Sequence, residues 1–234
     1  MPGPLFNTQT VQKILKKAEV LGLFRPWIKY PRTLHVPWSK SIQNDDRIMS
    51  STEKWNGINV VVSEKMDGEN TTMYRNYIHA RSTDSSNHQS RSWVKSFWSS
   101  IKHEIPEGWR ICGENCYAIH SIEYKELENY FLGFSIWNDK QECLSWNDTK
   151  EWFELLGITS VPVLYCGKYD EKKIQELWNA NKNLHHEGYV IRPENLFSFM
   201  NFSQMVGKFV RPNHVQTDKH WTRKIIIPNS IKLK

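Results

Sequence analysis

One short stretch of sequence decides how this chain folds and where its chemistry lies. It reads Ile58-Asn59-Val60-Val61-Val62-Ser63-Glu64-Lys65-Met66-Asp67-Gly68-Glu69-Asn70. Its apolar first half predicts a buried strand, and the Asp67-Gly68 pair favours a tight turn. Lys65 is therefore expected where a strand ends and the chain folds back, on a rigid element near carboxylates. A surface hairpin with ordinary charges is the alternative, and the rest of the chain has to decide between the two.

The composition indicates a folded domain with a basic surface. Of 234 residues, 39% are apolar, including 11 Trp, 10 Phe and 9 Tyr, which is enough to build a sizeable core and excludes global disorder. This length predicts a single domain over residues 1–234. Lys and Arg outnumber Asp and Glu by 31 to 25, a net charge of +6. That balance leans towards a polyanionic partner, although it also serves solubility.

Cysteine usage and hydropathy point to a cytoplasmic protein. The four cysteines show no Cys-x-x-Cys pair and no zinc spacing with histidine, so free thiols in a reducing compartment are expected. They are Cys112, Cys116, Cys143 and Cys166. The first residues lack the pattern of a signal peptide, and no window approaches the apolar length of a membrane span.

Helical and strand patterns alternate irregularly along the chain. Helices are predicted over residues 8–21, 93–101, 148–156 and 170–181. Strands are predicted at 58–62, 71–74, 77–81, 109–118, 130–137, 161–165, 188–192 and 205–210. Residues 29–39 contain two prolines and should be extended, 82–92 form a polar loop, and 220–234 form a basic tail. Without a regular βαβ order, the predicted class is α+β with mainly antiparallel sheet.

Charged residues recur at strand positions where a core residue is expected. They are Lys65, Arg81, Glu114, Glu187 and Lys208. Each one singly is compatible with a solvated face or a structural ion pair. Because buried ionisable groups are uncommon, five such residues are more simply explained by one polar cleft than by five separate accidents.

These residues also form an ordered series of motifs. The series is Lys65-Met66-Asp67-Gly68, Glu114, Phe134, Glu187-Gly188-Tyr189-Val190 and Lys208. It resembles the motifs of covalent nucleotidyltransferases, which comprise ATP-dependent RNA and DNA ligases and mRNA-capping guanylyltransferases. The Lys-x-Asp-Gly-Glu form of the first motif and the Glu-Gly-Tyr-Val-Ile-Arg form of the fourth resemble RNA ligases most, over roughly residues 30–220.

The resemblance implies an architecture. It implies a nucleotidyltransferase (ATP-grasp-like) core of mainly antiparallel sheets flanked by helices. Capping enzymes and DNA ligases normally carry an OB-fold domain after the fifth motif. Because 26 residues follow Lys208, no OB-fold domain is expected, which favours a minimal RNA ligase.

The resemblance assigns the nucleophile. Lys65 would attack the α-phosphate of ATP and become lysyl-AMP. A lysine with an ordinary pKa of about 10.4 is almost wholly protonated at neutral pH, so a nearby cation, a metal or desolvation has to lower that pKa. Lys208 would supply such a charge and hold the α-phosphate.

It also implies a nucleotide-binding set. Glu64 would read the base through its backbone or side chain, and Arg81 would contact phosphate or ribose. Glu114 would contact the ribose hydroxyls, and Phe134 would stack on adenine, although a plain core position fits Phe134 nearly as well. Glu187 would bind Mg²⁺ (or Mn²⁺), directly or through water, with the metal screening the phosphates.

Three further residues are candidates for phosphate or RNA contacts, namely Arg32, Asp67 and Arg211. The fifth motif of this family often has two lysines one residue apart, whereas here Lys208 stands alone. Arg211 is close by in sequence, but on a strand it would face away from Lys208. His186, directly before the fourth motif, is expected in a loop with an ordinary surface role.

The sequence thus favours an ATP-dependent RNA ligase that joins 5′-phosphate and 3′-hydroxyl ends of RNA through lysyl-AMP and RNA-adenylate. Its cofactors would be ATP and Mg²⁺ (or Mn²⁺). An accessory protein would be an additional partner if substrate choice does not rest on the core. A GTP-dependent capping-type guanylyltransferase and a non-catalytic basic RNA-binding module remain the alternatives.

Overall fold

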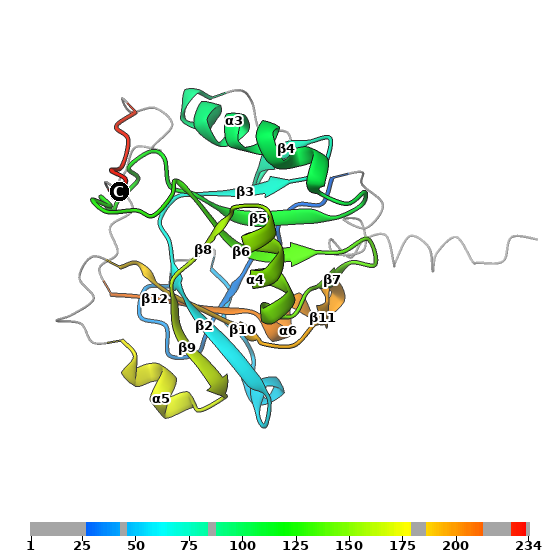
Figure 1. Ribbon diagram of the computed structural model, residues 1–234. Helices are drawn as coiled ribbons and strands as arrows, with labels where there is room; N and C mark the ends of the chain where they lie inside the picture. Colours follow the sequence, from blue (N-terminus) through cyan, green and yellow to red (C-terminus); the bar gives the residue numbers. More distant parts are fainter. Residues whose placement is uncertain (1–26, 43–45, 84–87, 179–185, 213–225, 233–234) are drawn as a thin grey trace, which may run out of the picture.

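Two β-sheets packed against each other form the body of the molecule in the computed structural model (Figure 1). The structure describes residues 27–42, 46–83, 88–178, 186–212 and 226–232. The helix predicted over residues 8–21 lies outside the described residues. The mixed helix and sheet content, with mostly antiparallel pairing, confirms the predicted α+β class.

The first sheet has five strands and carries Lys65. In spatial order they are β1 (Leu34–His35), β12 (Gly207–Val210), β10 (Gly188–Pro193), β2 (Asn59–Lys65) and β9 (Val163–Lys168). Every pair is antiparallel except β1 with β12. The central place of β2 explains its continuous apolar run, because Val60, Val61 and Val62 are all fully buried.

The second sheet has seven strands. Their path is β11 (Phe197–Ser198), β7 (Glu142–Cys143), β6 (Phe131–Trp137), β5 (Arg110–Asn115), β3 (Glu69–Met73) and β4 (Ile78–Ala80), with β8 (Thr159–Ser160) pairing β6 off this path. Only the short β6–β8 pair is parallel.

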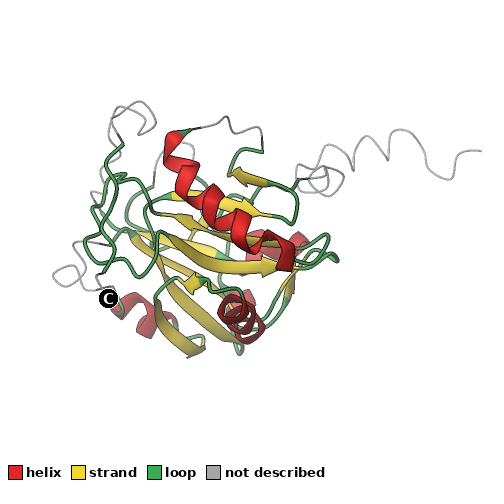
Figure 2. Ribbon diagram, turned by 45° about the horizontal axis from the view of Figure 1, so that its top comes forward, coloured by secondary structure: helices red, strands yellow, loops and turns green. Residues whose placement is uncertain are grey.

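Helices cover the outer faces of the two sheets (Figure 2), apart from the short helix that holds Phe202, which packs with Trp137. The helices are α3 (Ser92–Ile101), α4 (Trp146–Leu155), α5 (Glu171–Glu176) and α6 (Phe202–Met205), with 3₁₀ turns at Glu53–Trp55, Gln89–Arg91, Lys102–Glu104 and Phe199–Asn201. Val94 of α3 and Phe153 of α4 pack with Ile111 and Phe131 on the outer face of the seven-stranded sheet. Ile174 of α5 belongs to the core on the outer face of the five-stranded sheet. The layers are therefore helices, sheet, sheet and helix.

The inner faces of the two sheets share their own apolar contacts. Val61 of β2 clusters with Leu132 of β6, and Val190 of β10 packs against the cluster that contains Trp137. These contacts fix the distance between the sheets, so that residues from both can line one cavity.

Most predicted elements appear in the structure with their ends shifted by a few residues, and three of these differences are larger or have a clear cause. The strand predicted over 161–165 is β9, which begins two residues later. Pro162 has no N–H to donate to a strand ladder, and its carbonyl accepts from the Glu64 amide at 2.8 Å. Met205 ends α6 instead of opening β12, and the helix predicted over 170–181 is assigned only over Glu171–Glu176.

The turn after Lys65 differs from the prediction. The Asp67-Gly68 pair does not fold the chain back into a hairpin, because β2 and β3 belong to different sheets. Residues 66–68 instead carry the chain from one sheet to the other. A tight turn is a local preference, whereas the choice of sheet depends on long-range strand pairing.

Candidate active site

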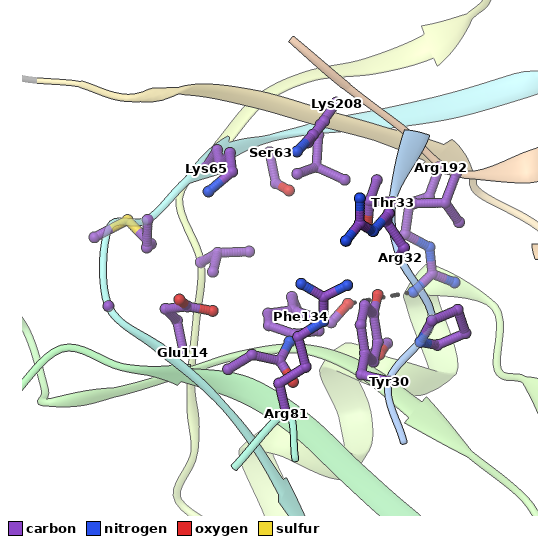
Figure 3. Close-up of a pocket in the computed structure, with 18 of the residues that line it drawn as sticks. Tyr30, Arg32, Thr33, Ser63, Lys65, Arg81, Glu114, Phe134, Arg192 and Lys208 are labelled. Carbon is purple, nitrogen blue, oxygen red and sulfur yellow. Dashed lines mark hydrogen bonds between the residues drawn. The ribbon is translucent and has the colours of Figure 1, made fainter. Parts of the chain in front are cut away.

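A cavity of about 630 Å³ opens between the two sheets. The predicted residues that line it come from both sheets and the connecting segments (Figure 3). They are Arg32, Glu64, Lys65, Arg81, Glu114, Phe134 and Lys208. One cleft thus gathers charged residues that are far apart in sequence.

Lys65 is the last residue of β2 and pairs with Gly188 of β10. This register brings Glu187 beside it, and the Lys65 Nζ donates to Glu187 Oε2 at 2.6 Å. Burial alone would lower the pKa of Lys65, but the negative charges of Glu187 and Glu114 outweigh it and raise the pKa above its ordinary value. The immediate neighbours of the amine are therefore carboxylates, whereas the sequence suggested a cation, and Lys65 is held protonated in this state.

Glu114 approaches Lys65 from the opposite sheet. Burial raises the pKa of Glu114 to about 8, and Glu187 adds to the rise, although the charge of Lys65 opposes it. A Cβ at Gly68 would lie 2.6 Å from the carbonyl oxygen of Asn115 and 3.0 Å from the Glu114 Cγ. Only glycine therefore lets the segment after Lys65 pass this close to β5.

Lys208 ends a chain of polar contacts that starts at a buried serine. Its Nζ lies 3.4 Å from Asp46 Oδ1, and Asp46 Oδ2 lies 3.1 Å from His35 Nε2. The other ring nitrogen of His35 is 2.8 Å from the Ser39 hydroxyl. Burial lowers the pKa of Lys208 and outweighs the opposing charge of Asp46. The network holds the Lys208 amine at the cavity wall.

Phe134 reaches the cavity because β6 contains a bulge. Cys112 pairs with Ser135 and Gly113 with Gly133, so Phe134 is the extra residue between two paired positions. Phe134 and its neighbour Ser135 both line the cavity. The Phe134 ring meets Tyr30 edge to face at 5.3 Å.

Arg32 and Arg81 add positive charge on the side of the cavity away from β2 (Figure 3). Burial lowers the pKa of Arg81, and the charge of Arg32 lowers it further, while Glu114 opposes both. Two guanidinium groups that repel each other at the wall of a cavity suit an anionic ligand between or beside them.

Glu64 lines the cavity, but its carboxylate is already engaged. Its Oε1 lies 2.7 Å from His186 Nδ1. Burial raises the pKa of Glu64, and His186 opposes the rise. Because Glu64 and Lys65 are neighbours on one strand, their side chains point to opposite faces. His186 thus has a specific partner, in place of the ordinary surface role expected for it.

Asp67 and Arg211 are not among the residues that line the cavity. The Asp67 Oδ2 accepts from the Ser121 amide, the Ser121 hydroxyl and the Ile122 amide at 2.7–2.8 Å. A carboxylate saturated in this way holds a loop and is unsuited to meeting a phosphate. Arg211 follows β12, and its amide donates to the Glu187 carbonyl at 3.0 Å.

Two arginines near the cavity were missed by the sequence reading. Arg192 is 6% exposed and donates to the carbonyls of Leu144 at 2.5 Å and Phe134 at 3.4 Å, so it ties β10 to the bulge. Arg91 binds both carboxylate oxygens of Glu69, at 2.6 and 2.5 Å. Arg192 could have been found from the sequence, because it is the arginine of the Glu-Gly-Tyr-Val-Ile-Arg motif. The sequence around Arg91 contains no comparable motif.

The donor set fits a metal that binds together with a nucleotide. In the described parts of the chain no cluster of three or more His, Cys, Asp or Glu side chains could hold a metal alone. The Glu187 carboxylate is not among the residues that line the cavity. It lies beside Lys65, which does line it, and close enough to Glu114 to influence its charge. Mg²⁺ is commonly held by one or two carboxylates, waters and substrate phosphates, and Glu187 suits that arrangement.

The chain matches the model of a known protein family. The family model described as RNA ligase matches residues 58–210, which is more than half of the chain. The chain therefore belongs to the RNA ligase family, and the resemblance seen in the sequence motifs is confirmed. A comparison with curated proteins finds no match.

A solved ligase structure shares the fold at low sequence identity. A putative ATP-dependent DNA ligase from Aquifex aeolicus matches with a TM-score of 0.53 and 18% identity, over 78% of this chain and 50% of that one. A mutant Naegleria gruberi RNA ligase with ATP and Mn matches with a TM-score of 0.49 and 18% identity, over 77% and 57%. This chain thus spans about half the length of these proteins.

Two remaining sequence expectations concern the cell compartment. All four cysteines are free thiols, as expected. In the part of the chain that the structure describes, no helix has the length and apolar character to cross a bilayer.

Proposed function

We propose that this protein is an ATP-dependent RNA ligase that joins a 5′-phosphate end to a 3′-hydroxyl end of RNA. The observation that carries the proposal is the position of Lys65. It ends a buried strand at a cavity between two sheets, with Glu187 at 2.6 Å and Glu114, Arg81, Phe134 and Lys208 around the same space.

The reaction would have three balanced steps. The Lys65 ammonium loses one proton to become the nucleophilic amine, which forms a nitrogen–phosphorus bond with the α-phosphorus of ATP. A second proton leaves the nitrogen, and the bond to pyrophosphate breaks, so that pyrophosphate leaves. A 5′-phosphate oxygen of RNA then attacks the same phosphorus, the nitrogen–phosphorus bond breaks, and RNA-adenylate forms. Finally a 3′-hydroxyl oxygen loses its proton and attacks the 5′-phosphorus of the RNA, and AMP leaves.

The cavity offers a place for each part of the nucleotide. Phe134 would stack on the base, and Glu64 would read the base edge through its backbone, because its carboxylate is paired with His186. Glu114 would meet the ribose hydroxyls. At neutral pH it is largely a neutral acid with a pKa of about 8, so it would donate as well as accept a hydrogen bond.

Positive charge would hold the phosphates. Lys208 would bind the α-phosphate, and Arg81 and Arg32 would bind phosphates of ATP or of the RNA end. The position of Lys208 at the cavity wall favours this role for Lys208 over Arg211, which does not line the cavity.

A divalent metal, Mg²⁺ or Mn²⁺, would be held by Glu187 and nucleotide phosphates, and would supply positive charge that screens the phosphates. The contact between Lys65 and Glu187 raises the pKa of the amine. Any positive charge at Glu187 therefore weakens that effect and favours the neutral, nucleophilic form of Lys65.

The broader assignments belong to the same proposal. They are one nucleotidyltransferase domain within residues 1–234, a cytoplasmic location and RNA as the macromolecular partner. What supports them is the family match together with the free thiols and the net charge of +6.

The first test asks which nucleotide reacts. The protein is incubated with Mg²⁺ and α-labelled ATP or GTP, and covalent label is followed on a denaturing gel. We expect label from ATP in the wild type and in Lys140→Ala, an exposed control, and none in Lys65→Ala. Label from GTP alone would indicate a capping enzyme, and no label would leave an RNA-binding module.

The second test asks for the ends that are joined. RNA strands with a 5′-phosphate and a 3′-hydroxyl should be sealed, and strands with a 5′-hydroxyl should not. Single strands, a nicked duplex and a broken stem-loop are compared under the same conditions. Labelling of the protein without sealing of any of these RNAs would contradict the ligase proposal while keeping the first step.

A further inference from the structure

The loop between β5 and β6, residues 116–130, holds the segment that follows Lys65. Its Ser121 and Ile122 amides both donate to the Asp67 carboxylate at 2.8 Å. Its Tyr124 hydroxyl accepts from the Asp67 backbone amide at 2.9 Å. Both the backbone and the side chain of Asp67 are thereby fixed by one loop.

Within this 116–130 loop the Cys116 amide donates to the Tyr130 carbonyl at 2.7 Å, but no helix or strand is assigned between them, so the other backbone groups need partners. The C-terminal segment, residues 226–232, supplies them. Ala118 bridges Pro228, and Leu127 bridges Ile231. The sequence predicts only a basic tail here. In the structure, the backbone of residues 226–232 pairs with the loop at several points.

Asn229 is the centre of the pairing and is 3% exposed. Its side-chain oxygen accepts from the Tyr124 amide at 2.7 Å, and its side-chain nitrogen donates to the Cys116 carbonyl at 2.8 Å. Its own amide donates to the Tyr117 carbonyl at 2.8 Å. Its carbonyl accepts from the Tyr130 hydroxyl at 3.0 Å. One buried residue, through its side chain and its backbone, therefore contacts both ends and the middle of the loop.

The contacts form a continuous path from the tail to the reactive amine. Asn229 fixes the backbone of Tyr124, Tyr124 fixes Asp67, and Asp67 is two residues from Lys65. We propose that the C-terminal segment is a clasp that sets the position of Lys65, with Asn229 and Tyr124 as positioning residues. This inference rests on the proposed function, in which Lys65 is the nucleophile.

The clasp acts on the reaction and not on nucleotide binding. Neither Tyr124 nor Asn229 lines the cavity, so neither touches a nucleotide bound there. Residues 66–68 are the only link between β2 and β3, and a small shift in them moves the Lys65 amine relative to the α-phosphorus. A misplacement of about 1 Å in a reacting group costs up to about a hundredfold in rate.

The test separates the rate of the first step from ATP affinity. Single-turnover transfer of AMP to the protein is measured at saturating ATP, and affinity is measured with an ATP analogue that cannot release pyrophosphate. Tyr124→Phe keeps the ring and removes the acceptor for the Asp67 amide. We expect a rate about tenfold lower with nearly unchanged affinity, because only the position of the reacting group changes.

Asn229→Ala should act in the same direction, and Lys232→Ala is the matched control. Lys232 lies in the same segment, and its exposed amine only approaches Glu128 at 3.4 Å, so rate and affinity should stay at wild-type values. If Asn229→Ala does not fold, Tyr124→Phe still decides the question.

Two results would overturn the clasp. One is a wild-type rate in Tyr124→Phe. The other is a loss confined to thermal stability or to the fraction of active protein, with a wild-type rate per active molecule, because that describes structural support alone. A wild-type protein that takes no AMP would instead overturn the proposed function itself.

Discussion

At the scale of single residues, two groups of the site have raised pKa values for different reasons, neighbouring charge for Lys65 and burial for Glu114. Lys65 is kept protonated by the carboxylates around it. Glu114, on the other sheet, is kept largely neutral by burial, with a pKa of about 8. The two groups face one cavity, so a change in the charge of one alters the other.

The raised pKa of Glu114 makes stability depend on pH. The unfolded chain releases this proton near pH 4.5 and the folded chain near pH 8. Between these values the folded state binds more protons, so the contribution of Glu114 to stability falls as pH rises. Glu114→Gln cannot titrate. Its melting temperature relative to wild type should therefore rise steadily from about pH 5 to about pH 8.

The measurement is thermal unfolding of both proteins across this range. A constant difference between the two melting temperatures would show that Glu114 has an ordinary pKa in the folded protein. A second signal comes from the carboxyl itself, whose titration can be followed directly by isotope-edited infrared spectroscopy.

At the scale of elements, the connection from β2 to β3 depends on glycine. A Cβ at Gly68 would clash with the Asn115 carbonyl at 2.6 Å, so Gly68→Ala should cost about 1–3 kcal/mol and displace Lys65. Gly57→Ala is a matched control, since Gly57 has φ +77° and open space around it. Gly57→Ala should lower the free energy of unfolding by about 1–2 kcal/mol, through backbone strain alone.

Both variants should unfold at lower denaturant concentration than wild type. Only Gly68→Ala should also lose the rate of AMP transfer, measured well below its unfolding transition. Equal transfer rates in the two variants would mean that the close approach of residues 66–68 to β5 has no bearing on the reaction.

The bulge in β6 makes a separate prediction for ATP binding. Stacking of a base on an aromatic ring is worth about 1–3 kcal/mol, so Phe134→Ala should weaken ATP binding by about ten- to a hundredfold. Phe134→Tyr keeps the ring and should bind nearly as well as wild type. The measurement is the equilibrium dissociation constant for ATP in both variants. Wild-type affinity in Phe134→Ala would show that Phe134 is a core residue that does not contact the base.

The elements also show what a sequence can predict. A continuous apolar run was enough to predict β2, and helical periodicity was enough for α3 and α4, because each of these helices buries one apolar face. The passage of residues 66–68 between sheets and the extra residue at Phe134 were not predictable, since both follow from pairing with strands far along the chain. The Asn229 contacts were missed because a lone asparagine in a tail has no periodic signal.

At the scale of the whole molecule, the cavity exists because two sheets meet face to face. Charged strand residues were predicted to converge on one cleft, and seven of the ten predicted site residues do line it. The prediction of these site residues rested on the order of the motifs along the chain, which is typical of a protein family. No single residue would have been enough. Their spatial partners, such as Asp46 for Lys208, required the structure.

The most direct measurement is to locate the covalent AMP. The protein is incubated with ATP and Mg²⁺, and its mass and its peptides are determined by mass spectrometry. We expect a mass gain of one AMP on the peptide that contains Lys65, lost in acid as expected for a nitrogen–phosphorus bond. No mass gain, or an AMP that sits elsewhere and persists in Lys65→Ala, would contradict the proposal.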